Sequence, residues 1–192
     1  MAAQDAPRHL NMLVYGASGV GKSVLAATGP GPILYLDLDD GLASVRSPTP
    51  QLVEELGLDV GNIYAQRIYN YGELKKALLT LTRLKHNSGF FSTVCLDNLT
   101  VMQAICMQER TSGDESVSID RLPQQQDWGI LLQRMRAIVR VIRDLPCHTV
   151  FIAMEQERDG FIGPALQGAI FREVPAMVDV CARYVLINRT AD

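Results

Sequence analysis

The sequence predicts an α/β fold in which a mainly parallel central sheet is flanked by helices. The first observation is that short apolar runs of strand length alternate with longer segments whose apolar residues recur at helical spacing. The second is that the short runs are apolar at successive positions, as in parallel strands buried on both faces. With 192 residues, 47% hydrophobic and 20% charged, the chain suits one such domain and is too short for two, so residues 1–192 are predicted to form a single domain.

The first strand and the first helix enclose a phosphate-binding pattern. Residues 10–15 form an apolar run that ends at a glycine, and residues 22–27 are helix-forming. The segment between them follows the pattern G-x-x-x-x-G-K-S, whose glycines let the backbone curl around a phosphate while the amides at the helix start attract it. This predicted ATP-binding segment consists of Gly16, Ala17, Ser18, Gly19, Val20, Gly21, Lys22 and Ser23.

Within this pattern, two side chains have predicted roles of their own. Lys22 would reach the β- and γ-phosphate oxygens of ATP, and the Ser23 hydroxyl would ligate Mg²⁺. The alternative is a glycine-rich turn that binds no nucleotide, but the position between a strand and a helix favours the phosphate site.

The remaining elements continue the alternation. Strands are predicted at 33–38, 63–68, 93–96, 149–154 and 184–188, and helices at 51–56, 72–86, 100–110 and 128–145. Two segments, 111–126 and 157–175, are polar or interrupted by glycine and proline and are predicted to be flexible loops. In the long helix Trp128 is expected to face the core, whereas Arg136, Arg140 and Arg143 form either a solvated face or a contact with DNA or another subunit.

Polar side chains follow three of the predicted strands. Asp97 ends the fourth strand and would hold the water shell of Mg²⁺, unless it only caps the strand. Asp39 follows the second strand and could orient or deprotonate an attacking water, whereas Asp40 is interpreted as a solvated turn residue. After the fifth strand, Glu155 or Gln156 would sense the γ-phosphate, and the sequence leaves open which of the two does so.

A local cluster of cations and aromatic rings is a candidate DNA site. The formal net charge of −3 argues against a globally basic nucleic-acid-binding protein but does not exclude a local site. Residues 157–172 combine arginines and phenylalanines with glycines, which suits single-stranded DNA because bases stack on rings and phosphates are neutralised. The candidate residues are Arg158, Phe161, Phe171 and Arg172; the alternative is an ordinary surface loop anchored by its phenylalanines.

The composition gives no support to several other classes of protein. The 4 cysteines show no C-x-x-C spacing and only 3 histidines are present, so no zinc site is predicted and the thiols are expected to be free and buried. No basic segment followed by an apolar stretch stands at the N-terminus, and no apolar run could span a bilayer. We therefore expect a cytoplasmic protein without membrane contact.

Several motifs together resemble the RecA-like AAA-type P-loop ATPases encoded by bacteriophages, a group that includes single-strand-annealing recombination proteins. The resemblance covers nearly the whole chain, and although the first motif is common to all P-loop proteins, the combination is more specific. The motifs are LVYGASGVGKS (13–23), LYLDLDDGL (34–42), VCLDNLT (94–100), QDWG (126–129), FIAMEQE (151–157) and GPALQG (163–168).

The resemblance implies a RecA-like P-loop NTPase core that hydrolyses ATP with Mg²⁺, binds single-stranded DNA and supports phage recombination or annealing. It implies a homo-oligomer, with a single-stranded-DNA-binding protein as a further candidate partner. Asp39 then takes the place of the RecA glutamate that activates water, and because aspartate is one methylene shorter, hydrolysis is expected to be slow. The loop 157–175 would correspond to a DNA-binding loop of recombinases, and Arg189 to the basic residue that completes a neighbouring subunit's site. The expected catalytic residues are Lys22, Asp39, Asp97, Glu155 and Arg189.

Two other functions stay open at this point. One is a DNA-annealing protein that binds ATP as a conformational ligand and hardly hydrolyses it, which the short Asp39 side chain favours. The other is a P-loop small-molecule kinase, against which the sequence offers no arginine-rich segment that would cover a phosphate acceptor.

Overall fold

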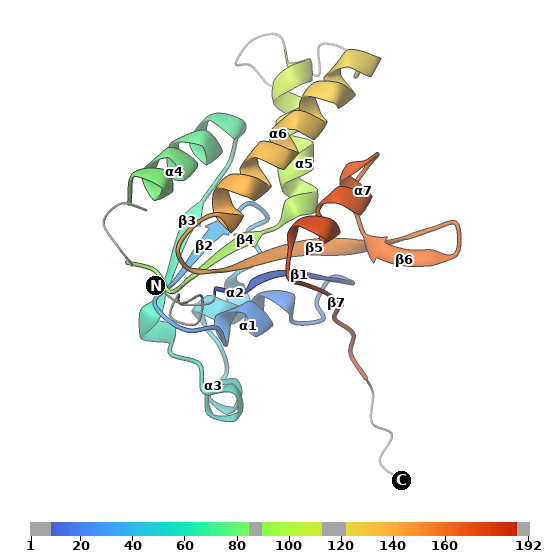
Figure 1. The fold of residues 1–192 in the computed structure, drawn as a ribbon. Helices are drawn as coiled ribbons and strands as arrows, with labels where there is room; N and C mark the ends of the chain where they lie inside the picture. Colours follow the sequence, from blue (N-terminus) through green and yellow to red (C-terminus); the bar gives the residue numbers. More distant parts are fainter. Residues whose placement is uncertain (1–8, 85–89, 113–121, 188–192) are drawn as a thin grey trace, which may run out of the picture.

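A central sheet organises the fold. The computed structural model describes residues 9–84, 90–112 and 122–187. Within these residues six strands pair in parallel in the order β3-β2-β4-β5-β1-β7, and β6 pairs antiparallel with β5 (Figure 1). The strands are β1 (Asn11–Gly16), β2 (Ile33–Asp37), β3 (Ile63–Arg67), β4 (Thr93–Asp97), β5 (His148–Arg158), β6 (Phe161–Pro164) and β7 (Val180–Arg183).

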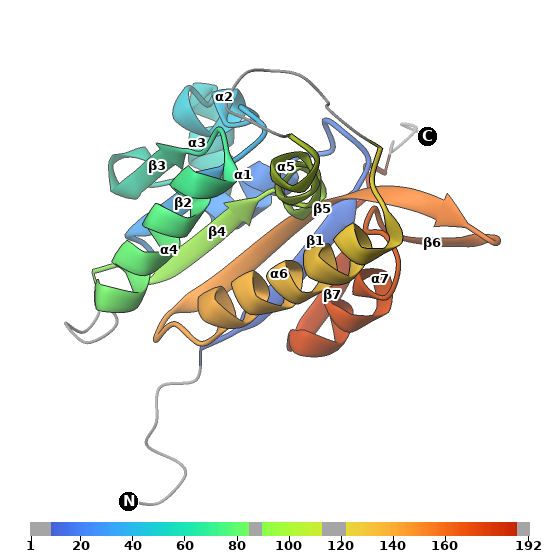
Figure 2. The same ribbon diagram turned by 90° about the horizontal axis from the view of Figure 1, so that it is seen from above.

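Helices cover both faces of this sheet. Figures 1 and 2 show α4, α5, α6 and α7 on one face and α1, α2 and α3 on the other. The helices are α1 (Lys22–Ala27), α2 (Ala43–Arg46), α3 (Pro50–Leu56), α4 (Tyr71–Leu84), α5 (Leu99–Thr111), α6 (Gln125–Arg143) and α7 (Ile170–Glu173), with 3₁₀ turns at Val60–Asn62 and Pro175–Met177. This arrangement confirms the predicted α/β fold.

Successive residues of a strand enter different cores. In β2, Leu34 and Leu36 join the core under α4, α5 and α6, whereas Ile33 and Tyr35 join the core under α1 and α2. Strand side chains alternate between the two faces of a sheet, so a strand covered on both faces must be apolar at every position. The continuous apolar runs in the sequence have this origin.

The sheet brings the carboxyl ends of its central strands together. Gly16 at the end of β1 lies beside Met154 in β5, and Asp37 at the end of β2 lies beside Asp97 at the end of β4. Because β5 lies between β4 and β1, all four strand ends meet at one edge of the sheet. The predicted site residues are attached to this edge.

The prediction of a flexible loop at 157–175 was wrong. β5 continues to Arg158 and turns back into β6 through Asp159 and Gly160, whose φ angles are 52° and 79°. Two successive residues with positive φ form the type I′ turn of a tight hairpin, and Asp-Gly is a typical sequence for it. The segment after β6 then forms α7 and the turn Pro175–Met177.

The prediction of a last strand at 184–188 was also wrong. The strand is β7, and it begins earlier because the Asp179 carboxylate accepts hydrogen bonds from the Asn11 backbone N–H at 2.8 Å and from its side-chain Nδ2 at 3.0 Å. These bonds place Val180 beside Met12 of β1. Leu186 and Ile187 lie beyond the strand and are exposed, while residue 188 lies outside the described part.

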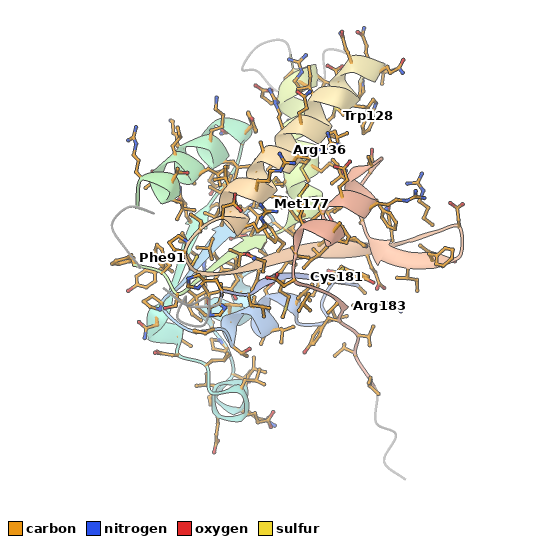
Figure 3. The ribbon with its side chains drawn as sticks, in the orientation of Figure 1. Phe91, Trp128, Arg136, Met177, Cys181 and Arg183 are labelled. Atoms are coloured by element: carbon orange, nitrogen blue, oxygen red, sulfur yellow. The ribbon has the colours of Figure 1, made fainter. Side chains whose placement is uncertain are left out.

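Trp128 was expected in the core but is 41% exposed. It lies in the first turn of α6, near the end of the helix that extends away from the sheet (Figure 3). α6 begins three residues earlier than predicted, because the Gln124 backbone N–H donates to the Asp127 carboxylate at 2.9 Å and thereby caps the helix. The buried residues of its apolar side are Leu131, Met135, Ile138, Val139 and Ile142.

The other expectations concern the loop before α6, the thiols and the membrane. The predicted loop 111–126 is shortened at both ends by α5 and α6, and residues 113–121 of it lie outside the described part. Cys95, Cys106 and Cys147 are free and buried as predicted, but Cys181 in β7 is exposed, which the prediction missed. No helix in the described ranges has the length and apolar character needed to cross a membrane.

Candidate functional site

The loop between β1 and α1 has the shape that its glycines allow. Gly19 and Gly21 have φ angles of 76° and 97°, which residues with a Cβ rarely adopt. Gly16 is required for a different reason: a Cβ built on it would lie 2.3 Å from the backbone oxygen of Tyr184. Tyr184 is itself fixed there, because its N–H donates to the Tyr15 carbonyl at 2.7 Å. The segment that follows β7 therefore packs directly against the start of the phosphate loop.

Lys22 is held by the same loop. Its ammonium donates to the carbonyl oxygens of Gly16 at 2.9 Å and Ala17 at 2.6 Å, and it lies 3.7 Å from the sulfur of Met154. Lys22 is only 7% exposed, and this burial lowers its pKa, while the carboxylates of Asp97, Glu155 and Asp39 act in the opposite direction. A buried cation at the mouth of a glycine-rich loop is suited to contact a phosphate.

Ser23 and Asp97 come together although they are far apart in the sequence. The Ser23 hydroxyl donates to Asp97 Oδ2 at 2.5 Å. Asp97 is 4% exposed, and burial raises its pKa; the hydrogen bond from Ser23 opposes this shift, and the charges of Asp37 and Asp39 add to it. A bound cation would stabilise the ionised form of a buried carboxylate that has other acids beside it.

This pair fits Mg²⁺. Mg²⁺ prefers hard oxygen ligands, and at nucleotide sites one or two protein oxygens complement the phosphates and water molecules. The described residues contain no group of three or more His, Cys, Asp or Glu side chains that could hold a metal by themselves. A hydroxyl and a carboxylate beside a phosphate loop match a magnesium ion that is bound together with a nucleotide.

Asp39 faces the same space. The Asn98 amide donates to Asp39 Oδ2 at 3.0 Å, and the Asn98 side-chain oxygen accepts the Val101 N–H at 2.9 Å as the N-cap of α5. Asn98 is a site residue that sequence reasoning missed, although it directly follows Asp97 and precedes a helix. A polar residue in that place has the sequence signature of an N-cap.

These residues enclose one cavity of about 150 Å³ at the carboxyl edge of the sheet. The structure thus brings together four of the side chains predicted from the sequence, Lys22, Ser23, Asp39 and Asp97. The complete lining is Ser18, Gly19, Gly21, Lys22, Ser23, Val24, Asp39, Gly41, Ser44, Asp97, Asn98 and Met154.

The two candidates for a phosphate sensor do not line this cavity. Glu155 is bound by Arg183 of β7, whose Nε and Nη2 lie 2.8 and 3.4 Å from its carboxylate oxygens, and this hydrogen bonding lowers the pKa of Glu155. Gln156 donates to the carbonyl of Leu166 at 3.0 Å. The β5 residue that reaches the cavity is Met154, one position earlier than predicted, and its apolar side chain gave no signal in the sequence.

The four predicted DNA-binding residues do gather at one place. Arg158, Phe161, Phe171 and Arg172 all line a groove of about 1110 Å³ between the β5–β6 hairpin, α7 and strands β1 and β7. Phe161 at the hairpin is 75% exposed. The other lining residues are Tyr15, Asp159, Ile162, Gly163, Pro164, Gly168, Ala169, Glu173, Pro175 and Cys181.

The acidic residue on the α7 side of this groove has a partner. Both oxygens of Glu173 accept hydrogen bonds from Arg136 of α6, each at 2.5 Å. A bidentate pair of this kind leaves little negative charge on Glu173 to repel an anionic ligand. Of the three arginines predicted along α6, Arg136 thus contacts α7, Arg143 pairs with Asp144, and Arg140 is exposed.

Hydrogen bonds connect the groove with the cavity. The segment between β6 and α7 is held from β5 by Gln156 and from α5 by Gln103, whose side-chain oxygen accepts the Gln167 N–H at 2.8 Å. On the cavity side, Thr100 Oγ1 of α5 accepts the Met154 N–H at 3.1 Å. Strand β5 therefore borders both sites, at Met154 and at Arg158, and α5 accepts a hydrogen bond beside each of them. Arg189, the predicted residue for a neighbouring subunit, lies outside the described residues.

A comparison with families of known proteins gives a match over almost the entire chain. The family model described as an AAA domain matches residues 8–190, which is almost the entire chain of 192 residues. A search of curated proteins gave no match.

Proposed function

This chain belongs to the AAA domain family, and on that premise we propose that it is a RecA-like, Mg²⁺-dependent ATPase that binds single-stranded DNA during phage recombination or annealing. The family is one of nucleotide-binding P-loop ATPases, and the cavity at Lys22 supports ATP as the ligand. The DNA part rests mainly on one observation: the two arginines and two phenylalanines picked from the sequence line a single groove.

Phosphate binding is the task of the loop and of Lys22. In the structure the Lys22 ammonium is satisfied by two carbonyl oxygens of its own loop. An incoming β- or γ-phosphate oxygen is a stronger, charged acceptor for the same ammonium. The loop N–H groups that the glycine conformations expose would complete the cradle.

Ser23 and Asp97 would hold the magnesium ion. When bound, Mg²⁺ neutralises negative charge on the β- and γ-phosphate oxygens. Asp97 contributes through a carboxylate whose burial by the sheet prevents it from moving toward solvent. Its hydrogen bond from Ser23 keeps the two oxygens adjacent.

Asp39 is the proposed positioning group for the attacking water. Its carboxylate lines the cavity and is oriented by the Asn98 amide. A carboxylate there can accept a proton from a water molecule while the water oxygen attacks the γ-phosphorus and ADP leaves. Because Asn98 directly follows Asp97 in the chain and its side chain donates to Asp39, it links the proposed water-positioning and metal-binding acids.

The groove would bind single-stranded DNA without strong sequence preference. Phe161 and Phe171 offer ring faces for bases, and Arg158 and Arg172 can neutralise phosphates. Stacking of one base on an aromatic ring contributes about 1–3 kcal/mol and tolerates any base. We further propose that the protein acts as a homo-oligomer, with Arg189 reaching a neighbouring subunit, and alongside a single-stranded-DNA-binding protein.

The double variant Arg158→Ala/Arg172→Ala tests the DNA site. Measured against salt concentration, its affinity for an oligo-dT strand should be lower, and the slope of log Kobs should flatten by about 1.4, since each neutralised phosphate of a single strand contributes about 0.7. The matched control is Lys75→Ala/Lys76→Ala, which removes the same charge from the exposed side of α4. An unchanged slope in the groove variant would move the DNA site elsewhere.

The steady-state ATP hydrolysis rate with and without the strand tests the link between the sites, with Lys22→Ala as the blank. Stimulation by DNA supports the proposed ATPase. DNA binding with negligible hydrolysis in both conditions would instead favour the annealing protein that uses ATP as a conformational ligand, and phosphate transfer to a small acceptor would favour the kinase.

A further inference from the structure

One arginine contacts both sides of the turn that carries Asp39. This turn follows β2, whose last residue, Asp37, is fully buried and lies in register with Arg67 at the end of β3. Arg67 Nη1 lies 3.1 Å from Asp37 Oδ1 and 3.8 Å from Asp40 Oδ1. One guanidinium therefore contacts the residue two positions before Asp39 and the residue directly after it.

The ion pair between Arg67 and Asp37 is important because the Asp37 carboxylate is buried. Burial raises the pKa of Asp37, and the positive charge of Arg67 is the largest effect that opposes this shift. The other oxygen of Asp37, Oδ2, has no hydrogen-bond partner among the residues that the structure describes, and Arg46 of α2 approaches it only to 3.8 Å. A buried carboxylate in this state depends on the guanidinium of Arg67 and on the Asp39 backbone N–H, whose hydrogen bond also lowers the pKa of Asp37.

The sheet holds the backbone of the turn at its beginning. The carbonyl of Asp37 accepts the Ile68 N–H at 2.8 Å, and the Leu38 N–H donates to the Asp97 carbonyl at 2.6 Å. Beyond Leu38 the chain leaves the sheet, and Asp40 has a φ of 55° in the left-handed region. At that point side-chain contacts decide where the turn lies.

We infer that Arg67 is a positioning residue that sets the location of the Asp39 carboxylate by bridging Asp37 and Asp40. Arg67 does not line the cavity, so it acts through the turn and not on the nucleotide. The planar guanidinium suits this task because its several N–H groups point in fixed directions, whereas an ammonium is a single flexible point charge. Its side chain is also stacked near the ring of Tyr69, with Cζ 5.2 Å from the ring centre, which restricts it further.

This inference rests on the proposed ATPase function for its effect on rate, but its structural part can be tested without hydrolysis. Arg67→Lys keeps the positive charge beside buried Asp37, so the variant is expected to fold. Asp40→Asn removes the charge at the outer end of the bridge, and asparagine accepts the left-handed backbone conformation of that position. The matched controls are Arg143→Lys and Asp144→Asn, which alter an arginine–aspartate pair at the far end of α6.

The first measurement is hydrogen–deuterium exchange of a peptide that covers residues 38–41. Both bridge variants should exchange faster than the wild type in this peptide, while the peptide around Asp97 and both control variants stay unchanged. Unaltered exchange at 38–41 in the folded Arg67→Lys variant would overturn the inference, whether or not the protein hydrolyses ATP.

The second measurement separates kcat from ATP affinity. Arg67→Lys should lower kcat about tenfold and Asp40→Asn about threefold, because small displacements of a catalytic group cost rate and not binding. The ATP dissociation constant, measured by calorimetry, should change by less than about twofold. An equal loss of affinity and rate would mean that Arg67 supports the whole pocket, which contradicts a positioning role. A wild type with no hydrolysis would refute the proposed function and leave the exchange result to decide on the bridge.

Discussion

The proposed activity needs a negative charge at Asp97, which would hold the magnesium ion. Without ligands, burying that charge destabilises the fold. Burial raises its pKa, and the neighbouring charges of Asp37 and Asp39 raise it further. The hydrogen bond from Ser23 and the charge of Lys22 oppose this shift of the pKa but do not cancel it. Such a residue favours function at a cost in stability.

Replacing this carboxylate by an amide should therefore stabilise the empty protein. Asp97→Asn keeps an oxygen that can accept from Ser23 and removes the buried charge, so we expect a higher melting temperature at pH 7.5 without ligand. The same variant should lose the stabilisation that Mg²⁺ adds to nucleotide binding. A melting temperature equal to or below that of the wild type would contradict this account of Asp97.

The pH dependence of that difference has a definite sign. In the unfolded chain the Asp97 carboxyl has an ordinary pKa of about 4, and in the folded chain its pKa is higher. Between these two values the folded state holds the extra proton, so its free energy of unfolding falls as the pH rises through that window and stays lower above it. The stability gap between Asp97→Asn and the wild type should close as the pH is lowered toward 4.

At this scale the sequence predicted the residues that a fixed motif or a strand end marks. Lys22 and Ser23 belong to the loop pattern, and Asp39 and Asp97 follow apolar runs whose ends meet in a parallel sheet. It did not predict Arg67, because its role depends on a register between β2 and β3 that no local pattern encodes. The sequence could not show that Met154 lines the cavity and that Glu155 and Gln156 do not, for a similar reason: the exact register of β5 decides which of these three successive residues reaches it.

At the scale of the elements, α6 and the β5–β6 hairpin show which features the sequence pattern predicts and which it does not. The buried residues of α6 were visible as a helical repeat, but Trp128 fits the same spacing and still lies outside, because the first turn extends past the sheet. The hairpin was missed although Asp159 and Gly160 have a typical turn sequence, because the glycines that follow made the whole segment look irregular. The conformational preferences of Asp159 and Gly160 thus decided the structure of this segment, and its overall glycine content did not.

One glycine in α6 offers a test at the scale of a helix. Gly129 is exposed within the helix, and a Cβ built on it would have nothing within 4 Å. Gly129→Ala should raise the free energy of unfolding by about 0.5–1 kcal/mol, because alanine loses less conformational freedom on folding. Chemical denaturation would measure this change. Gly163→Ala is the contrasting variant, since its Cβ would lie 2.6 Å from the Phe171 ring, and it should be destabilising.

At the scale of the whole molecule, strand β5 connects the phosphate cavity with the groove. It borders the phosphate cavity at Met154 and the groove at Arg158, so both sites are attached to one continuous strand in the middle of the sheet. We therefore expect a ligand bound in the cavity to stabilise the sheet as a unit. This coupling between binding and global stability can be measured directly.

Mg²⁺–ATP should raise the melting temperature of the protein. At a ligand concentration of about 100 times the dissociation constant the stabilisation is about 2.7 kcal/mol, which corresponds to a shift of about 5–10 °C for a chain of this size. Lys22→Ala should abolish the shift, whereas Lys75→Ala, which alters a lysine beside Tyr71 on α4, should retain it. A full shift in Lys22→Ala would contradict the assignment of the phosphate loop.

The contact between Gly16 and Tyr184 has a consequence for protein engineering and for sequence drift. Removing the exposed Leu186 and Ile187 would be one way to make the protein more soluble. A chain that ends before Tyr184, however, would lack the backbone against which the phosphate loop is packed. Shortened versions should therefore retain Tyr184, and nucleotide affinity should drop sharply between versions ending on either side of it. The same contact ties two distant positions together during evolution: a side chain can enter position 16 only if the path of the chain after β7 changes with it.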